Sequence, residues 1–182
     1  MIARITLAAS VAAALTVALT IPTFAQVQKK DMSGVRNYSR VDATVGCGGA
    51  VDPTAMKALK GEGYVSVINL RLASEEGANV DAGRAAAQAA GLKYIHLPFN
   101  AAMPDSKVVD SFLTAVADKR NQPVFIHCGS ANRVGGVWMI KRVLQDHWAA
   151  DRAMTEAEAI GLTSPQLKAF ATEYIKTHQQ HE

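Results

Sequence analysis

Residues 123–136 read PVFIHCGSANRVGG, a short apolar run followed by a small polar loop and then a longer apolar pattern. Val124 to Ile126 are β-favouring residues, and the apolar residues from Val134 onward recur at helical spacing. The stretch therefore predicts a strand, a tight loop and a helix. Cys128 is expected at the C-terminal end of that strand.

The predicted loop after Cys128 has two features suited to an anion. Its backbone N–H groups lie at a predicted helix N-terminus, where unpaired donors and the positive end of the helix dipole favour anions and a thiolate. Arg133 adds a fork of donors that matches two oxygens of a tetrahedral anion. We expect Cys128 to be a catalytic nucleophile and Arg133 its catalytic partner. The expected substrate-binding loop residues are Gly129, Ser130, Ala131 and Asn132.

The pair His127-Cys128 and the ending Asn132-Arg133-Val134-Gly135 resemble the signature of dual-specificity protein tyrosine phosphatases. That signature has His-Cys, five residues, Arg, then Ser or Thr and Gly. Here four residues separate Cys128 from Arg133, and Val134 replaces the hydroxyl residue. The shorter spacing also resembles rhodanese-type sulfurtransferases and a group of bacterial phosphatase-like proteins whose loop is Cys-Arg-Ser-Gly-Thr-Arg.

The resemblance implies a cysteine-dependent phosphatase that acts through a phosphocysteine intermediate. Two alternatives stay open: a sulfurtransferase that carries a persulfide on Cys128, and an oxyanion-binding module without turnover. The His-Cys pair favours the phosphatase, whereas the four-residue spacing favours the sulfurtransferase. A phosphorylated substrate is the expected partner, either a small molecule or a protein.

A second run carries the same resemblance. Residues 64–71 are nearly continuous and apolar, as expected of a strand buried on both faces. A helix, a glycine, Val-Ile-Asn-Leu-Arg and then the acidic pair Glu75 and Glu76 look like the front half of the bacterial phosphatase-like group. The likeness covers roughly residues 41–175.

Strand and helix patterns alternate through the rest of the chain. Strands are expected near residues 41–45 and 92–98, with a turn at 46–49. Helices are expected from Pro53, at 80–90, from Ser106, at 150–159 and from Pro165. The alternation predicts an α/β fold with a mostly parallel central sheet flanked by helices and with a helical C-terminal tail. The resemblance implies that this fold is cysteine phosphatase-like. Ligands bind beyond the carboxyl ends of such strands, so the loops after Leu70, Pro98 and His127 should share one rim.

Three further side chains are candidates for this rim. Phosphate transfer needs an acid for the leaving oxygen, and Asp105, after the 92–98 strand, is the expected general acid. Asp105 is equally suited to cap the helix that follows it. Arg71 is a candidate substrate-binding residue or a partner of Glu75. His127 is expected to support the loop from the opposite face of the strand and to favour the Cys128 thiolate.

Residues 1–25 have the charged start, apolar core and small residues typical of a secretory signal peptide. Cleavage would leave about 157 of the 182 residues, lower the formal net charge from +3 to about +2, and leave no stable membrane anchor. The protein is therefore expected in the periplasm or outside the cell. Residues 26–40 are predicted to form a loose arm, and residues 41–178 a single phosphatase-like domain.

The chain has two cysteines, Cys47 and Cys128, and export would place both in an oxidising compartment. One interpretation is a structural disulfide. The other is that Cys47 is a redox partner that reversibly locks a catalytic Cys128, since reactive thiolates are the most easily oxidised.

Other classes of function lack support in the sequence. The histidines show no metal-ligand spacing with cysteine or carboxylate residues, so we expect no metal, and no motif indicates a cofactor. No basic block or aromatic-basic pattern accompanies the near-neutral charge, which argues against nucleic-acid binding.

Overall fold

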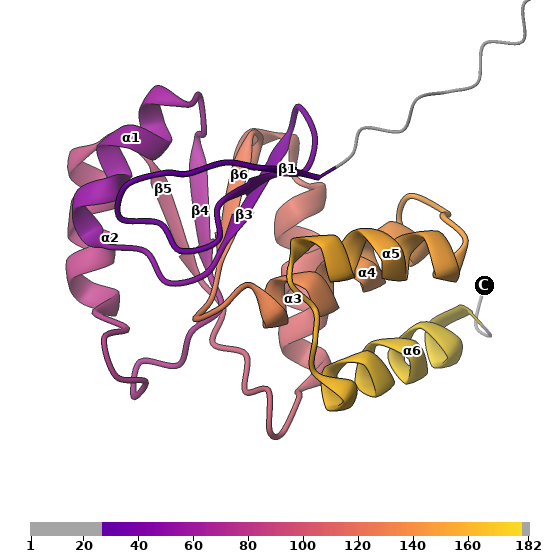
Figure 1. The fold of residues 1–182 in the computed structure, drawn as a ribbon. Helices are drawn as coiled ribbons and strands as arrows, with labels where there is room; N and C mark the ends of the chain where they lie inside the picture. The colour runs from indigo at the N-terminus through magenta and orange to yellow at the C-terminus, as the bar shows by residue number, and fades with distance from the viewer. Residues whose placement is uncertain (1–26, 180–182) are drawn as a thin grey trace, which may run out of the picture.

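The computed structural model describes residues 27–179 (Figure 1), so the predicted signal peptide lies outside the described residues. The strands are β1 (Gln28–Lys29), β2 (Ser39–Arg40), β3 (Val45–Gly48), β4 (Ser66–Asn69), β5 (Lys93–His96) and β6 (Val124–His127). The helices are α1 (Met56–Gly61), α2 (Val80–Ala89), α3 (Ser106–Ala117), α4 (Asn132–Leu144), α5 (Ala150–Ile160) and α6 (Pro165–Gln179). Short 3-10 turns, η1 (Pro53–Ala55) and η2 (Lys119–Asn121), precede α1 and β6.

The six strands form one sheet in the order β1-β2-β3-β6-β4-β5. The neighbouring strands β3, β6, β4 and β5 pair in parallel, and β1 and β2 add an antiparallel edge beside β3. Figure 1 shows α1 and α2 on one face of the sheet and α3 and α4 on the other, with α5 and α6 beside α4. The predicted fold class is confirmed, including the helical C-terminal tail.

Successive side chains of each strand point to opposite faces of the sheet, so the hydrophobic core has two parts, one on each face. Ile68, Ile126 and Cys128 belong to the core beneath α3 to α6, whereas Val67 and Phe125 belong to the core beneath α1 and α2. Both faces of these strands are buried, because successive side chains in a strand point to opposite sides. This explains why the strand sequences are continuously apolar.

The segment predicted as a loose arm is ordered at the edge of the sheet. Ser39 pairs with Cys47, and Gln28 in turn pairs with Arg40. Tyr38 is buried, and its ring stacks on Phe125 with 5.9 Å between the centroids. The prediction failed because β1 and β2 have two residues each, too few to show a period.

The glycine-rich run at residues 46–49, predicted as a turn, lies mostly within strand β3. A Cβ on Gly46 would overlap the Tyr64 hydroxyl and lie 2.6 Å from Tyr64 Cζ. The glycine is therefore needed for close packing against an aromatic ring, not for a change of chain direction. Cys47 consequently lies inside a central strand, fully buried.

The helical tail is fastened to the sheet by a buried ion cluster around Arg142 of α4. Its guanidinium contacts Glu156 of α5 at 2.7 Å and Asp42, before β3, at 2.9 Å. Glu156 also accepts a hydrogen bond from Trp138 Nε1 at 2.8 Å. The cluster holds α4, which begins directly after the loop at residues 129–131, against α5 and against the segment before β3.

Within residues 27–179, no helix combines the length and apolar character required to cross a membrane.

Candidate active site

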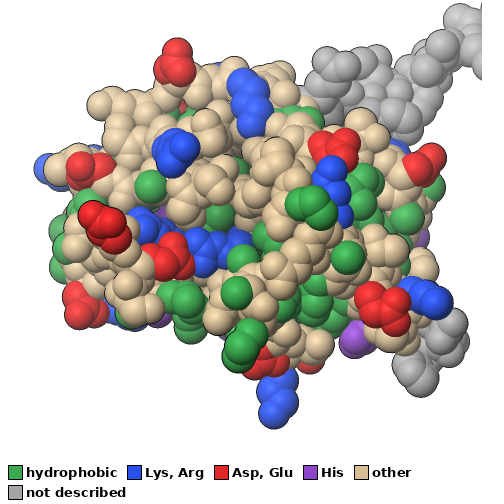
Figure 2. Space-filling model, turned by 60° about the horizontal axis from the view of Figure 1, so that its bottom comes forward, with side chains coloured by type: hydrophobic (Ala, Val, Ile, Leu, Met, Phe, Trp, Pro, Cys, Tyr) green, Lys and Arg blue, Asp and Glu red, His purple; other side chains and the backbone are tan. Residues whose placement is uncertain are grey.

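The loops that follow β3, β4, β5 and β6 meet at one end of the sheet, as predicted. Figure 2 views the molecule with this end turned forward, and basic and acidic side chains lie close together on that face. Cys128 follows β6 directly, and its backbone N–H donates to Gly48 O at 3.3 Å. The Cys128 side chain is only 1% exposed, so a reacting group has to enter the loop to reach the sulfur.

The loop that follows Cys128, residues 129–132, is held by its backbone. Gly129 O accepts from Ala50 N at 3.0 Å. Gly49 packs so tightly here that a Cβ on it would lie 2.9 Å from Gly129 O and 3.1 Å from Ser130 Cα. Among the described residues, the N–H groups of residues 129–133 donate no hydrogen bond to protein, and α4 begins within this run. Unpaired donors at a helix N-terminus are the arrangement that the predicted anion cradle requires.

Arg133 reaches back from the first turn of α4 to the loops after β4 and β5. Its Nη1 donates to Leu70 O at 3.2 Å and Phe99 O at 3.1 Å. Nη1 and Nη2 also bind the two carboxylate oxygens of Glu75 at 2.5 and 2.8 Å. The ion pair with Glu75 uses the edge of the guanidinium formed by Nη1 and Nη2. Among the described residues, this leaves Nε–H and one Nη2–H, on the side edge of the guanidinium, for an anion. Burial lowers the pKa of Arg133, but Glu75 and the Cys128 sulfur raise it above its ordinary value.

Glu75 is a site residue whose role the sequence did not predict. Burial raises the pKa of its carboxyl group, but hydrogen bonds from Arg133 and from Leu72 N outweigh burial and hold the pKa at about 2. Glu75 also accepts from Arg71 Nε at 3.2 Å. The acidic pair after β4 was the only sequence signal for it, because its partner Arg133 is 58 residues away.

Arg71 holds the loop after β4 through its guanidinium group. This corrects the prediction that Arg71 binds the substrate. Besides Glu75, its guanidinium donates to Gly77 O at 2.8 Å and Glu76 O at 2.6 Å. The side chain is 8% exposed. The alternative prediction, that Arg71 pairs with Glu75, is confirmed.

Asn132 lies in the predicted loop, and its side chain has a further, structural role. Its amide side chain binds Thr163 Oγ1 at 2.8 Å and accepts from Thr163 N and Ser164 N, both at 3.1 Å. The Asn132 side chain therefore fixes the connection between α5 and α6 against the loop. The backbone N–H of Asn132 is the group left to bind an anion. Ser130 O accepts from Asn37 Nδ2 at 3.3 Å, which ties the segment before β2 to the same loop.

A cleft of about 440 Å³ opens beside the cradle. Its lining includes Ser130, Asn132 and Arg133 from the signature loop, Glu75, and Asn100 to Ala102 after β5. Asp105, the predicted general acid, is not among the lining residues. It is exposed at the start of α3, where its side chain accepts from Lys107 N at 2.9 Å. The geometry thus gives Asp105 the capping role and does not bring it to Cys128.

His127 lies on the predicted face of the strand, but its ring carries no positive charge that would favour the Cys128 thiolate. It is 3% exposed, on the sheet face opposite to Cys128, and neither ring nitrogen has a hydrogen-bond partner among the described residues. Burial lowers its pKa to about 4, so the ring is neutral at pH 7. Its ring stacks beside Phe125, with 6.2 Å between the centroids.

The structure does not support a direct bridge between the two cysteines. Both are free and buried, and Cys47 lies opposite Ile126, two residues before Cys128. The usual strand spacing and rise then separate their Cα atoms by about 8 Å, beyond the ~7 Å limit for a disulfide. Burial raises the pKa of the Cys47 thiol well above its ordinary value, and Glu156 and Asp42 raise it further.

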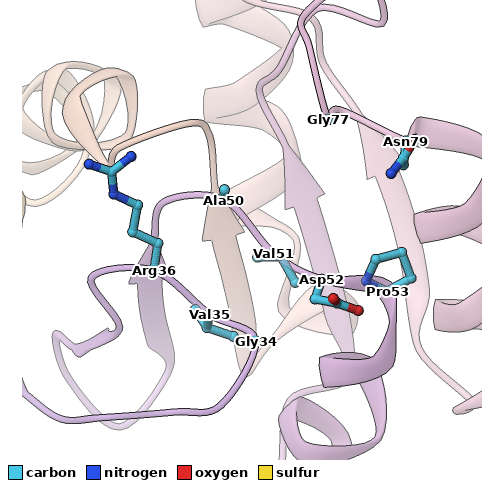
Figure 3. A pocket seen from close by; sticks show the side chains of 9 residues that line it. All are labelled: Gly34, Val35, Arg36, Ala50, Val51, Asp52, Pro53, Gly77 and Asn79. Atoms are coloured by element: carbon cyan, nitrogen blue, oxygen red, sulfur yellow. The ribbon is translucent and has the colours of Figure 1, made fainter.

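Two other features of the described chain concern ligand binding away from the cradle. No three His, Cys, Asp or Glu side chains in residues 27–179 lie close enough to hold a metal ion. A second pocket of about 470 Å³ lies between the segment before β2 and the loop after β3, and Figure 3 shows the Arg36 side chain pointing away from Asp52 and Pro53 there. None of the predicted site residues lines it.

The family follows from sequence comparison. Residues 38–145 match the family described as beta-lactamase hydrolase-like protein, phosphatase-like domain. The chain belongs to this family, since the match spans more than half of it. None of the curated proteins matches the chain.

Three solved structures of phosphatases or putative phosphatases have a similar fold. A putative phosphatase (DUF442) of Shewanella putrefaciens CN-32 has a TM-score of 0.69 at 22% identity, over 79% of this chain and 94% of its own. P. aeruginosa TpbA has a TM-score of 0.64 at 21% identity, over 86% and 92%. The core catalytic domain of the S. cerevisiae PP-IP phosphatase SIW14 has a TM-score of 0.65 at 18% identity, over 83% and 95%. These likenesses show the same fold, and together with the family match they confirm the predicted phosphatase-like domain.

Proposed function

We propose that this protein is an exported, cysteine-dependent phosphatase that hydrolyses phosphomonoesters through a phosphocysteine intermediate. One observation carries the proposal. Cys128 is followed by five backbone N–H groups, those of residues 129–133, that donate no hydrogen bond within the described part of the chain, and Arg133 ends this run with side-chain donors left for an anion. The expected nucleophile and a set of anion-binding donors thus lie in the same loop.

In the proposed mechanism, Cys128 Sγ attacks phosphorus and the substrate oxygen leaves. The N–H groups of residues 129–133 and the side edge of Arg133 hold the equatorial oxygens, where negative charge is concentrated in the transition state. Glu75 keeps the guanidinium in position, since its two oxygens fix the opposite edge. Water then hydrolyses the phosphocysteine.

The relatives support a phosphorylated substrate, either a small molecule or a protein. One TpbA structure is a complex with pTyr, and SIW14 is named a PP-IP phosphatase. The two names cover very different substrates on similar folds, so the family likeness supports the phosphoryl group and not the molecule that carries it.

The test is phosphate release from 4-nitrophenyl phosphate by the reduced protein without residues 1–25. Cys128→Ser and Arg133→Ala should each abolish measurable activity, because one removes the nucleophile and the other the charge on the transition state. Arg120→Ala is the matched control, since Arg120 is exposed and pairs locally with Asp118. Activity that survives Cys128→Ser would contradict the proposal.

A sulfurtransferase is the second candidate, favoured by the four-residue spacing between Cys128 and Arg133. The smaller loop suits a single sulfur atom, which Cys128 would carry as a persulfide. Transfer of sulfur from thiosulfate to cyanide, assayed beside phosphate release, separates the two. Thiocyanate formation without phosphate release would replace the phosphatase by the sulfurtransferase.

Export is proposed from residues 1–25 alone. The full chain expressed in a Gram-negative host should appear in the periplasm or medium without its first 25 or so residues. N-terminal sequencing and cell fractionation would check this, and an uncleaved protein in the cytoplasm would contradict it.

A further inference from the structure

The cleft beside the cradle contains cationic and backbone donors but no protonated carboxylic acid. Among the described residues that line it, Glu75 is the single carboxylic side chain. Arg133, Arg71 and Leu72 N all donate to its oxygens, and its pKa of about 2 means that it is ionised at neutral pH. Glu75 therefore positions Arg133 and has no proton to give to a leaving group.

The loop after β5 supplies no acid to the cleft either. Its lining residues are Asn100, Ala101 and Ala102, and Asn100 Oδ1 accepts from Ala102 N at 2.9 Å. An amide is not a proton donor for catalysis at neutral pH. Asp105, later in the same loop, is bound to Lys107 N outside the cleft.

The remaining side chains near the site do not fill this role. Ser130 and Ser164 line the cleft, but a serine hydroxyl is far too weak an acid to protonate a leaving oxygen by itself at neutral pH. His127 lies buried on the opposite face of the sheet. His96 faces another pocket, and its Nε2 is paired with Arg71 O at 2.8 Å.

We propose that the site acts on phosphoryl groups whose leaving oxygen departs as a stable anion without a proton from the protein. The substrate class is therefore aryl phosphates, acyl phosphates and phosphoanhydrides, and simple alkyl phosphates are poor substrates. The inference rests on the proposed phosphatase function and narrows its substrates.

The chemistry balances without an acid. In the first step an electron pair of the Cys128 thiolate forms the S–P bond, the P–O bond breaks, and its electron pair leaves on the oxygen as an anion. In the second step water attacks phosphorus, the S–P bond breaks to restore the thiolate, and the proton of water passes to solvent. Only the first step depends on the leaving group.

The expected effect follows from what an acid normally adds. A positioned general acid contributes roughly 10²–10⁴-fold to the rate, mostly for basic leaving groups. Without it, kcat/KM should fall steadily from acetyl phosphate and 4-nitrophenyl phosphate to phenyl phosphate. Glycerol 2-phosphate, an alkyl phosphate, should be slower than 4-nitrophenyl phosphate by at least ~10²-fold.

Asp105→Asn provides the decisive variant, measured on all four substrates. Asparagine is as good a helix cap as aspartate, so the fold is retained while the acid is removed. The expected kcat/KM equals that of the wild type within about twofold on every substrate. Asp52→Asn is the matched control, because Asp52 also caps a helical turn, through Thr54 N at 2.8 Å, away from the cleft.

Three other outcomes would overturn the inference. A selective loss on phenyl phosphate with Asp105→Asn, absent with Asp52→Asn, would show that Asp105 moves in to act as the acid. Equal kcat/KM on the alkyl and aryl phosphates would show that some group protonates the leaving oxygen. In both cases the phosphatase function stands. Absence of phosphate release from any of the four substrates would remove the proposed function together with the inference.

Discussion

Glu75→Gln removes the charge that joins Arg133 and Arg71 while keeping the size of the side chain. The wild-type carboxylate accepts from Arg133 at 2.5 and 2.8 Å, from Arg71 at 3.2 Å and from Leu72 N at 2.7 Å. The amide of glutamine keeps one acceptor and turns the other into a donor, which then faces guanidinium donors. Both arginines are largely buried, so the loss is not fully replaced by water.

The magnitude follows from the pKa of Glu75, which falls from 4.5 to about 2 on folding. At about 1.4 kcal/mol per unit, the shift corresponds to at most ~3 kcal/mol. The side chain is 25% exposed, and screening by solvent reduces the expected loss to ~1–2 kcal/mol. Because the folded pKa lies below the unfolded one, this stabilisation is complete above pH 4.5 and disappears as the pH falls toward 2.

The assay is urea unfolding followed by tryptophan fluorescence at several pH values between 7 and 3, together with kcat/KM at pH 7. Glu75→Gln should unfold more easily at pH 7, with a difference from the wild type that shrinks below pH 4.5. It should also lose about tenfold in kcat/KM, since ~1.4 kcal/mol of positioning is lost. Glu76→Gln is the matched control, because Glu76 is exposed and Arg71 contacts only its backbone oxygen. Equal stability of the two variants at pH 7 would refute the anchoring role of Glu75.

Three further predictions concern the sheet. Gly46→Ala should lower the free energy of unfolding by ~2 kcal/mol or more, since a Cβ would collide with Tyr64, whereas Gly61→Ala, with open space around it, should change it little; equal thermal melting of both variants would contradict this. The wild type should lose stability as the pH falls from 6.5 to about 4, because buried neutral His127 binds a proton only in the unfolded state, and His127→Gln should lose less in urea titrations over that range. Cys47→Ala should leave the rate of peroxide inactivation and its reversal by reductant unchanged, because the Cys47 thiol is fully buried with a raised pKa; slower inactivation or lost reversal would restore its redox role.

Much of the fold could be predicted because its signals are local. Several elements depend only on residues that are close in sequence. They are the strand-loop-helix unit around Cys128, the buried strand before Arg71, and the helix caps at Asp52 and Asp105. Their order alone predicts parallel strands, since a crossover helix returns the chain in the same direction. The two-residue strands β1 and β2 were not predicted, because they are held by strand pairing at the sheet edge, β2 with β3 and β1 with β2.

The site residues likewise fall into those that the local sequence predicts and those that only the tertiary structure brings together. Residues 123–136 by themselves predicted a cysteine nucleophile, a backbone anion cradle and an arginine, because one short loop brings all three together. Only the tertiary structure decided that Glu75 holds this arginine from 58 residues away, that Asp105 caps a helix outside the cleft, and that Cys47 lies two residues out of register with Cys128. Such relations depend on strand register and on the path of each loop, which are set by packing of the whole core and leave no period or motif in the sequence.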